Sequence, residues 1–227
     1  MTADIRRSPV DAATVIGIDL SGPHGFQRTA AVAFDIVEGR LHRRSAQDGA
    51  DDRDILELAA TAAETGPVVI GIDAPLSYQS GGGDRPADRQ LRRRVVAAGL
   101  TSGTVMPPTL TRMAYLTLRG VVLTRLLRDT LGGAVTMVEV HPAAAMVLRG
   151  APVGDVRQFS SSERSRQNLL KWHASQGVDS IARHGHPVSG HYVAACAAAL
   201  AAWQWHLGRA CWSYPAEPPF HPFDVAC

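Results

Sequence analysis

The same five-residue stretch occurs twice in this chain, and it constrains the fold more than any other feature of the sequence. Residues 15–19 and residues 69–73 both read Val-Ile-Gly-Ile-Asp, and each copy is followed by a turn-prone segment. A short apolar run bounded by turn signals is typical of a strand buried on both faces, as in a parallel sheet. Ligands of such sheets bind beyond the carboxyl ends of the strands. Asp19 and Asp73 end the two runs, so both aspartates are predicted to lie at a ligand site.

The segments between the two copies predict how they come together. Residues 29–37 and 40–45 favour strands joined by a tight turn, which indicates an antiparallel meander after the first strand. A helix then runs from a cap at Asp51 or Asp52 to about residue 65. If this helix is a right-handed crossover, it returns the chain to a position beside the first strand. The two repeated strands then become parallel neighbours in one sheet.

Parallel pairing of the repeats has two consequences for their side chains. Asp19 and Asp73 come to lie side by side on strands ~4.8 Å apart, where two carboxylates can share one divalent cation. Alternation also places Gly17 and Gly71 on the same face as the aspartates. Because glycine has no side chain, a packed helix or a ligand can approach that face closely.

The rest of the chain predicts one more strand, several helices and two irregular ends. Residues 78–131 form a helical insertion after the fourth strand, and residues 135–140 form the fifth strand. A nearly all-apolar helix over residues 190–207 is expected to be buried. Residues 1–13 are interpreted as a loose leader, and the proline-rich residues 209–227 as a tail that wraps the surface.

Composition excludes several classes of protein. With 227 residues, 45% of them hydrophobic and 19% charged, the chain is globular and forms a single predicted domain over residues 1–227. A net charge of +2 indicates no large nucleic-acid footprint. The three cysteines show no metal-binding spacing and suit a reducing compartment. We find no secretory signal and no membrane-spanning run, so we expect a cytoplasmic protein without a membrane partner.

Three acids make a candidate metal site. Asp19, Asp73 and Glu139 all fall at or near the carboxyl ends of predicted buried strands. Carboxylates are hard oxygen ligands suited to Mg²⁺ or Mn²⁺, and close together they do not all stay ionised without a cation. A metal held there could polarise a phosphate and supply a hydroxide nucleophile. The alternative interpretation is that each acid only caps the turn after its strand.

Two histidines are candidates for proton transfer. His141 follows Glu139 by two residues, and it could bind metal, shuttle a proton, or simply start the turn before Pro142. His191 opens the predicted last helix, from which its side chain could reach across the strand ends. The alternative for His191 is an exposed residue in the first turn of that helix.

Two arginines and two serines are the predicted substrate contacts. Arg112 and Arg119 lie two turns apart on the long helix of the insertion, and either could clamp an anion. A solvated helix face is the alternative for both. Ser21 and Ser77 lie in the turn segments after the two repeated strands, beside the predicted site.

Five motifs, taken in order, carry a family resemblance over nearly the whole chain. They are GIDLSG at 17–22, IDAPLS at 72–77, VMPPTLTRMAYLTLRG at 105–120, VEVHPAAA at 138–145 and CAAALAAWQW at 196–205. With these motifs the chain resembles a family of uncharacterised bacterial and archaeal proteins described as predicted nucleases with a ribonuclease H-like fold. The resemblance implies an α/β fold whose five-stranded mixed sheet has the order 3-2-1-4-5, with helices on both faces.

The resemblance also implies a divalent-metal site. Acids of the first and fourth strands, here Asp19 and Asp73, would hold the metal, and Glu139 with His141 matches the fifth-strand motif of the family. One position departs from the pattern, because Ala194 stands where an acid of the last helix is expected. Either Glu139 and His191 complete the site, or the activity is altered or lost.

These observations predict a hydrolase that uses Mg²⁺ or Mn²⁺, first of all a nuclease that cleaves phosphodiester bonds of nucleic acid. Two alternatives remain open: an enzyme of the same fold that acts on a nucleotide-like small molecule or phosphorylated metabolite, and a catalytically degenerate binding protein. A closed pocket under the insertion would favour a small molecule, whereas an open basic groove would favour nucleic acid. The sequence leaves a homo-oligomer open as well.

Overall fold

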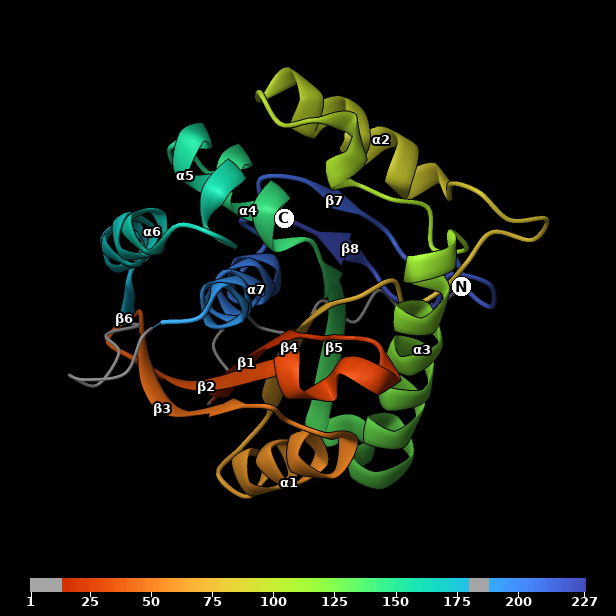
Figure 1. Ribbon diagram of the computed structural model, residues 1–227. Helices are drawn as coiled ribbons and strands as arrows, with labels where there is room; N and C mark the ends of the chain where they lie inside the picture. The colour runs from red at the N-terminus through yellow and green to blue at the C-terminus, as the bar shows by residue number, and fades with distance from the viewer. Residues whose placement is uncertain (1–13, 180–187) are drawn as a thin grey trace.

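The centre of the molecule is a mixed β-sheet. The computed structural model describes residues 14–179 and 188–227, so the predicted leader over residues 1–13 lies outside the described residues. The five main strands lie in the order 3-2-1-4-5 (Figure 1). They are β1 (Thr14–Asp19), β2 (Ala30–Val37), β3 (Arg40–Asp48), β4 (Val68–Asp73) and β5 (Val135–Val140). Strand β2 runs antiparallel to its neighbours, whereas β1, β4 and β5 are parallel. The predicted ribonuclease H-like fold is confirmed.

Three two-residue strands, which the sequence did not predict, extend both edges of the sheet. Strand β6 (Val178–Asp179) pairs with β3, and β8 (Val225–Ala226) pairs with the end of β5 and with β7 (Ser213–Tyr214). Strands this short leave no periodic pattern in a sequence. The proline-rich tail, predicted to wrap the surface, therefore ends inside the sheet, where Cys227 is fully buried.

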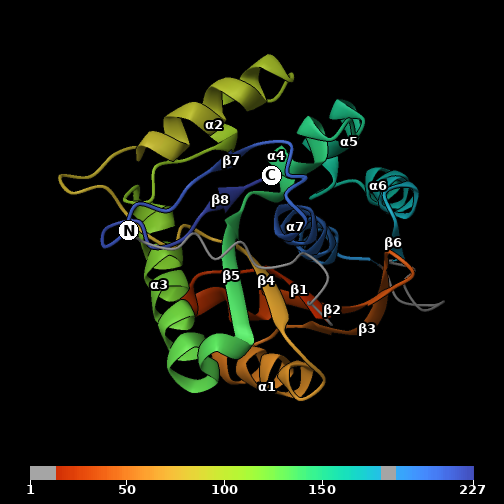
Figure 2. The same ribbon diagram turned by 180° about the vertical axis from the view of Figure 1, so that it is seen from behind.

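Helices cover both faces of the sheet (Figures 1 and 2). One face packs against α7, with smaller helices beyond it, and the other packs against α1 and α3. None of the described helices is long and apolar enough to cross a membrane. The helices are α1 (Asp52–Ala63), α2 (Pro86–Ala97), α3 (Thr111–Leu131), α4 (Pro142–Leu148), α5 (Val153–Gln158), α6 (Glu163–Ser175) and α7 (Gly190–His206).

The two repeated strands are parallel neighbours in perfect register, as predicted. Gly17 pairs with Gly71, and Asp19 pairs with Asp73. The crossover between them is α1, whose N-cap Asp51 accepts hydrogen bonds from the backbone of the first turn. The sheet order thus brings two distant copies of one motif to the same edge.

The glycines of the repeats allow the last helix to approach the sheet. A Cβ atom on Gly17 would lie 1.9 Å from the carbonyl oxygen of Ala195, and one on Gly71 would lie 2.5 Å from that of Ala198. Both contacts are with the backbone of α7, so a side chain at either glycine would displace the helix. The alanines of α7 and the two glycines form one closely packed layer, which directs the N-terminus of α7 toward the ends of β1 and β4.

Candidate active site

The centre of the candidate site is the pair Asp19 and Asp73. The two carboxyl groups lie at the ends of adjacent parallel strands and are hydrogen-bonded to each other. Burial raises the pKa of Asp73 well above its ordinary value, and the charge of Asp19 raises it further. Burial also raises the pKa of Asp19. Two neighbouring carboxyl groups with raised pKa values favour a proton or a cation between them, and a divalent cation would neutralise both charges.

His191 contacts the first of these acids. Its Nδ1 atom lies 2.6 Å from Oδ2 of Asp19, and its side chain remains 43% exposed. The hydrogen bond to Asp19 raises the pKa of His191 against the opposing effect of partial burial. The ring is in the first turn of α7, where Ser189 caps the helix. The helix that packs on the glycines therefore also brings His191 into contact with Asp19.

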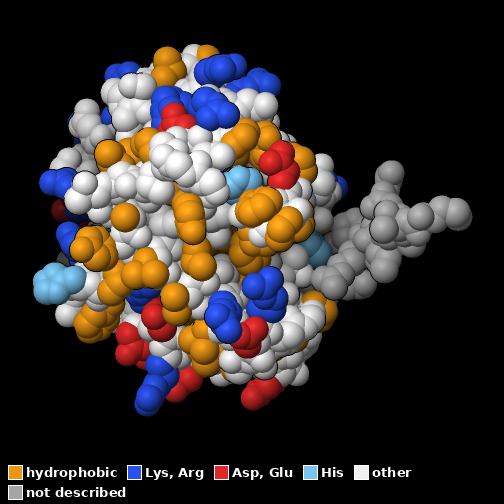
Figure 3. Space-filling view, turned by 90° about the vertical axis from the view of Figure 1, so that its right-hand side faces the viewer, with side chains coloured by type: hydrophobic (Ala, Val, Ile, Leu, Met, Phe, Trp, Pro, Cys, Tyr) orange, Lys and Arg blue, Asp and Glu red, His pale blue; other side chains and the backbone are white. Residues whose placement is uncertain are grey.

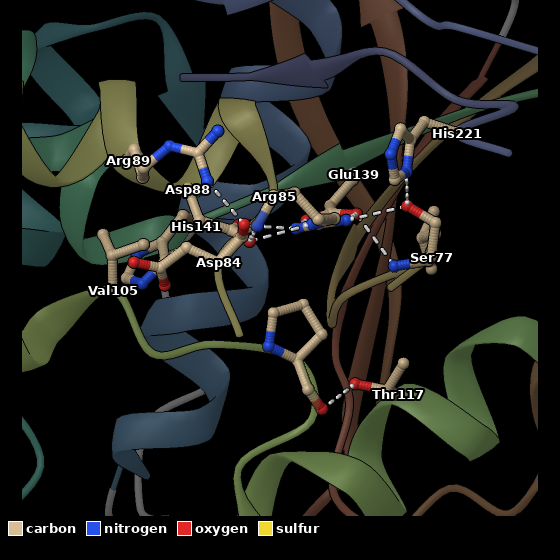
Figure 4. A network of polar contacts seen from close by, with 12 residues as sticks. Ser77, Asp84, Arg85, Asp88, Arg89, Val105, Thr117, Glu139, His141 and His221 are labelled. Atoms are coloured by element: carbon tan, nitrogen blue, oxygen red, sulfur yellow. Dashed lines mark hydrogen bonds and ion pairs between the residues drawn. The ribbon is translucent and has the colours of Figure 1, made fainter. Parts of the chain in front are cut away.

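Glu139 lies near the pair but makes different contacts. It pairs in register with Ile72, one residue before Asp73, so its side chain leaves the sheet on the other face. Both of its carboxylate oxygens are occupied (Figure 4). Oε2 accepts hydrogen bonds from the backbone of Leu76 at 2.8 Å and from Arg85 at 2.7 Å, and Oε1 accepts a second bond from Arg85. Both oxygens of Glu139 are therefore engaged by a buried ion pair and a backbone amide, contacts that the sequence analysis did not expect.

Arg85 is the residue that organises this part of the site, and the sequence analysis missed it. Its five N–H donors all have acceptors: Glu139 and Asp88 each take two, and Ser77 takes one at 3.1 Å. Burial alone would lower the pKa of Arg85, but the two carboxylates raise it. The guanidinium is thus a permanent, saturated cation with no donor left for a substrate anion.

The sequence does not point to Arg85, because the spacing on this helix suggests a different ion pair. Asp88 and Arg92 have the spacing of a surface ion pair, whereas in the structure Asp88 is buried against Arg85 and Arg92 pairs with Asp84. Ser77, a predicted substrate contact, is buried between Arg85 and Nδ1 of His221, which lies 2.9 Å from its hydroxyl. The C-terminal tail therefore contacts the Arg85 network through His221 and Ser77.

His141 has a structural role here. Its Nε2 donates to the carbonyl oxygen of Thr104 at 2.7 Å, while Nδ1 caps α4 by accepting from the backbone of Ala144. Burial lowers the pKa of His141, which keeps the ring neutral. With both ring nitrogens engaged, the turn-starting alternative describes His141 better than the predicted metal ligand or proton shuttle.

The two predicted anion-binding arginines are separated from the pair. Arg119 is buried and binds Asp52, the Thr29 hydroxyl and the carbonyl oxygens of Ser21 and Ala50, so it ties the turn after β1 to α1 and α3. Ser21 contributes backbone atoms to this clamp. Arg112 is exposed in the first turn of α3, and no contact with the site is seen for it among the described residues.

A cavity of about 240 Å³ lies above the aspartate pair. Its floor is the strand ends, and its walls come from the insertion, including Leu91, Met106, Met113 and Leu116. The charged lining consists of four acids and one arginine: Asp19, Asp73, Asp88, Glu139 and Arg85. Because that arginine is saturated, the cavity attracts cations and repels a bare phosphate.

The donor set suits a hydrated hard cation. No group of three or more His, Cys, Asp or Glu side chains in the described parts of the chain is arranged to hold a metal ion. Asp19 and Asp73 therefore provide two carboxylates without a third protein ligand. Mg²⁺ is commonly bound in this way, by one or two carboxylates together with waters and the phosphate of a substrate.

Comparison with known proteins places the chain in a family. Residues 17–219 match the model of the family described as "Protein of unknown function (DUF429)". The chain belongs to the DUF429 family. No curated protein sequence matches it.

One solved structure that is similar to this chain is "T. thermophilus RuvC in complex with Holliday junction substrate". The two proteins share 11% sequence identity, with a TM-score of 0.41, over 86% of this chain and 97% of that one. The fold assignment of this DUF429 protein rests on its own strand order.

Proposed function

We propose that this DUF429 protein is a divalent-metal-dependent hydrolase of phosphate esters, with phosphodiester cleavage as its first candidate reaction. The observation that supports this proposal best is the pair of partly buried carboxyl groups of Asp19 and Asp73, which lie side by side in register under a cavity with an acidic lining. Such a pair is costly without a cation, and a bound cation would turn the acidic cavity into a phosphate site.

The residues divide the work as follows. Asp19 and Asp73 would hold Mg²⁺ or Mn²⁺, which when bound supplies a Lewis acid for the phosphate and lowers the pKa of a water. His191 orients the Asp19 carboxylate through its Nδ1 contact, and its partly exposed ring is placed to carry a proton to or from the cavity. Arg85 keeps Glu139 and Asp88 charged and fixed, which adds to the negative potential that attracts the cation.

The shape of the cavity favours a second candidate within the same reaction class. The insertion forms the walls of a cavity of about 240 Å³, which is smaller than a typical drug-sized ligand pocket. The arginines expected to line a nucleic-acid groove are engaged elsewhere or lie apart from the pair. A nucleotide or another small phosphate ester therefore fits this site better than duplex nucleic acid does.

The test is a comparison of hydrolysis with Mn²⁺ and with Mg²⁺ on labelled single- and double-stranded DNA and RNA, and on nucleotides and a generic phosphodiester. Asp19→Asn and Asp73→Asn should abolish the metal-dependent activity and weaken Mn²⁺ binding in calorimetry. Glu57→Gln, an exposed carboxylate on α1, is the matched control and should leave both unchanged. Equal activity of the wild type and both Asn variants on every substrate would contradict the proposal.

A further inference from the structure

The outer face of α3 carries a stripe of exposed apolar side chains. Figure 3 views the molecule from the side on which α3 lies, and hydrophobic side chains gather across the middle of that face. Tyr115 is 65% exposed, Leu118 is 57% exposed and Val122 is 51% exposed. Val121 and Leu126 flank them and are also exposed. An apolar patch of this kind on a soluble fold indicates an interaction surface.

The stripe has the spacing of a helix–helix seam. We define the α3 seam as Thr111, Tyr115, Leu118, Val122, Arg125 and Asp129, which follow one another at intervals of four, three, four, three and four residues. This is the alternation of core positions in a heptad repeat, which lines up on one side of a helix. The opposite side of α3, with Leu123 and Leu127, is buried against the sheet. The middle of the seam is therefore a second apolar face of the same helix, on which no part of residues 14–179 and 188–227 packs closely enough to bury it.

We propose that two copies of this chain pair through the α3 seam, with the two helices antiparallel about a two-fold axis. In that arrangement Leu118 of each copy lies against Val122 of the other, at the centre of the seam. Tyr115 then faces Arg125 of the other copy, which is the geometry of a cation–π contact. Thr111 faces Asp129 of the other copy, and its hydroxyl can donate to the carboxylate.

The charges of the seam select this arrangement. A parallel pair would place Arg125 against Arg125 and Asp129 against Asp129, which is repulsive. Within one copy these two residues have only a weak contact with each other, at 3.4 Å, and their side chains are 80% and 62% exposed. In the antiparallel pair Arg125 faces the ring of Tyr115 and Asp129 faces the hydroxyl of Thr111. The surface therefore complements itself, as a two-fold interface requires.

A shallow apolar groove beside the seam enlarges the contact. It has a volume of about 300 Å³ and is lined in part by Tyr78, Ala114, Leu118 and Val121. Two helices of this length give a seam of roughly 30 Å, and the groove widens it toward the size of a small specific interface.

The first experiment measures the mass of the full chain in solution. Sedimentation equilibrium between about 5 and about 200 µM, which brackets the affinity of a small interface, should give twice the 24.2 kDa mass of one chain at the upper end. Leu118→Glu should hold the protein at the mass of one chain, and because Leu118 is exposed its melting temperature should equal that of the wild type at the lowest concentration, where both are single chains. Val96→Glu, on the exposed face of α2, is the matched control and should dimerise like the wild type.

The second experiment determines the direction of the helices. Thr111→Cys and Asp129→Cys are made separately in a Cys211→Ser background, because Cys211 is the exposed native thiol. In the antiparallel pair, equal positions lie about 27 Å apart, so neither variant alone should form a disulfide dimer, whereas mixing the two should.

Three results would overturn the proposal. These are a single-chain mass at every concentration, a dimer that Leu118→Glu does not weaken, and a disulfide formed by either cysteine variant alone. A single-chain mass would mean that the seam binds a different macromolecule. A dimer that Leu118→Glu does not weaken would form through another surface, and a disulfide of one cysteine variant alone would mean parallel helices.

Discussion

The two copies of the repeated motif are identical in sequence and paired in register, yet they differ in chemistry. The first copy ends on Asp19, which contacts a partly exposed histidine of α7. The second ends on Asp73, whose strand lies between β1 and β5 and which is influenced by the charges of both Asp19 and Glu139. Asp73 accordingly has its pKa raised well above the ordinary value, mainly by burial. The surroundings of each strand end, and not the motif itself, decide which of the two acids has the more strongly raised pKa.

The glycines of the two copies differ in the same way. The missing side chain of Gly17 is replaced by backbone of α7 at both a carbonyl oxygen and an amide nitrogen, whereas Gly71 faces a longer contact. The first copy is therefore the more tightly packed against α7, and the second is the more strongly influenced by charge. The experiments below test this division.

The largest effect is expected from the first glycine. Gly17→Ala puts a methyl group 1.9 Å from the Ala195 carbonyl oxygen, and should cost about 4 kcal/mol or prevent folding, whereas Gly71→Ala should cost about 2 kcal/mol. Urea denaturation measures both. Gly154→Ala is the control, since that glycine faces open space in α5 and alanine favours a helix. Equal losses in the free energy of unfolding for the two variants would show that both glycines are packed equally tightly against α7.

The two aspartates should be equally necessary for the proposed reaction. Asp19→Asn and Asp73→Asn should each lower metal-dependent turnover by about a thousandfold, which corresponds to about 4 kcal/mol. Only Asp19→Asn also removes the charged acceptor of His191, so only that variant should change the His191 ring signals in NMR spectra recorded without metal. Identical spectra for the two variants would contradict the asymmetry.

Near the second copy, the buried carboxylates of Glu139 and Asp88 depend on Arg85 for their neutralising charge. Arg85→Met leaves the buried carboxylates of Glu139 and Asp88 without their cation, and should lower the free energy of unfolding by about 3 kcal/mol. Denaturant titration measures the loss. Arg93→Met, at an exposed position of the same helix, should change stability by less than about 0.5 kcal/mol. A neutral effect at Arg85 would mean that these acids are solvated.

The smallest effect is expected at the histidine of the first copy. His191→Gln should lower kcat by roughly tenfold to a hundredfold while the metal affinity changes little, because the ring acts on Asp19 and on protons. His24→Gln, an exposed histidine in the 3₁₀ turn after β1, serves as the control. A loss of metal binding as large as that of Asp19→Asn would make His191 a ligand.

Much of the architecture could be predicted because it depends on short, strong patterns. The bounds of β1 and β5 and the pairing of the repeats follow from apolar runs, turn residues and the right-handed crossover. The glycines predicted the close approach of a packed helix or a ligand, and in the structure α7 makes that approach. The edge strands β6, β7 and β8 and the helix α5 were missed, because a segment of a few residues has no period of its own.

The site could be predicted only in part. The position of Asp19 beside Asp73 could be predicted because both copies end on the same residue type at the same edge of the sheet. Arg85 and His221 could not be found, since one precedes a helix far from β5 in sequence and the other lies in a proline-rich tail. Glu139, His141 and Arg119 have side chains that could bind a metal, a proton or an anion. In the structure they instead form hydrogen bonds with distant backbone and side-chain groups, which stabilise the fold.

The sequence by itself therefore determined that two identical strands end on two acids and that a helix or a ligand can approach the glycines of both strands closely. Those facts are local, because they depend on side-chain alternation and on the missing side chain of glycine. Only the tertiary structure decided which acid has the more strongly raised pKa, which histidine contacts the pair and which carboxylates Arg85 binds. Those outcomes depend on burial and on charges brought together from distant parts of the chain, and no local pattern records either.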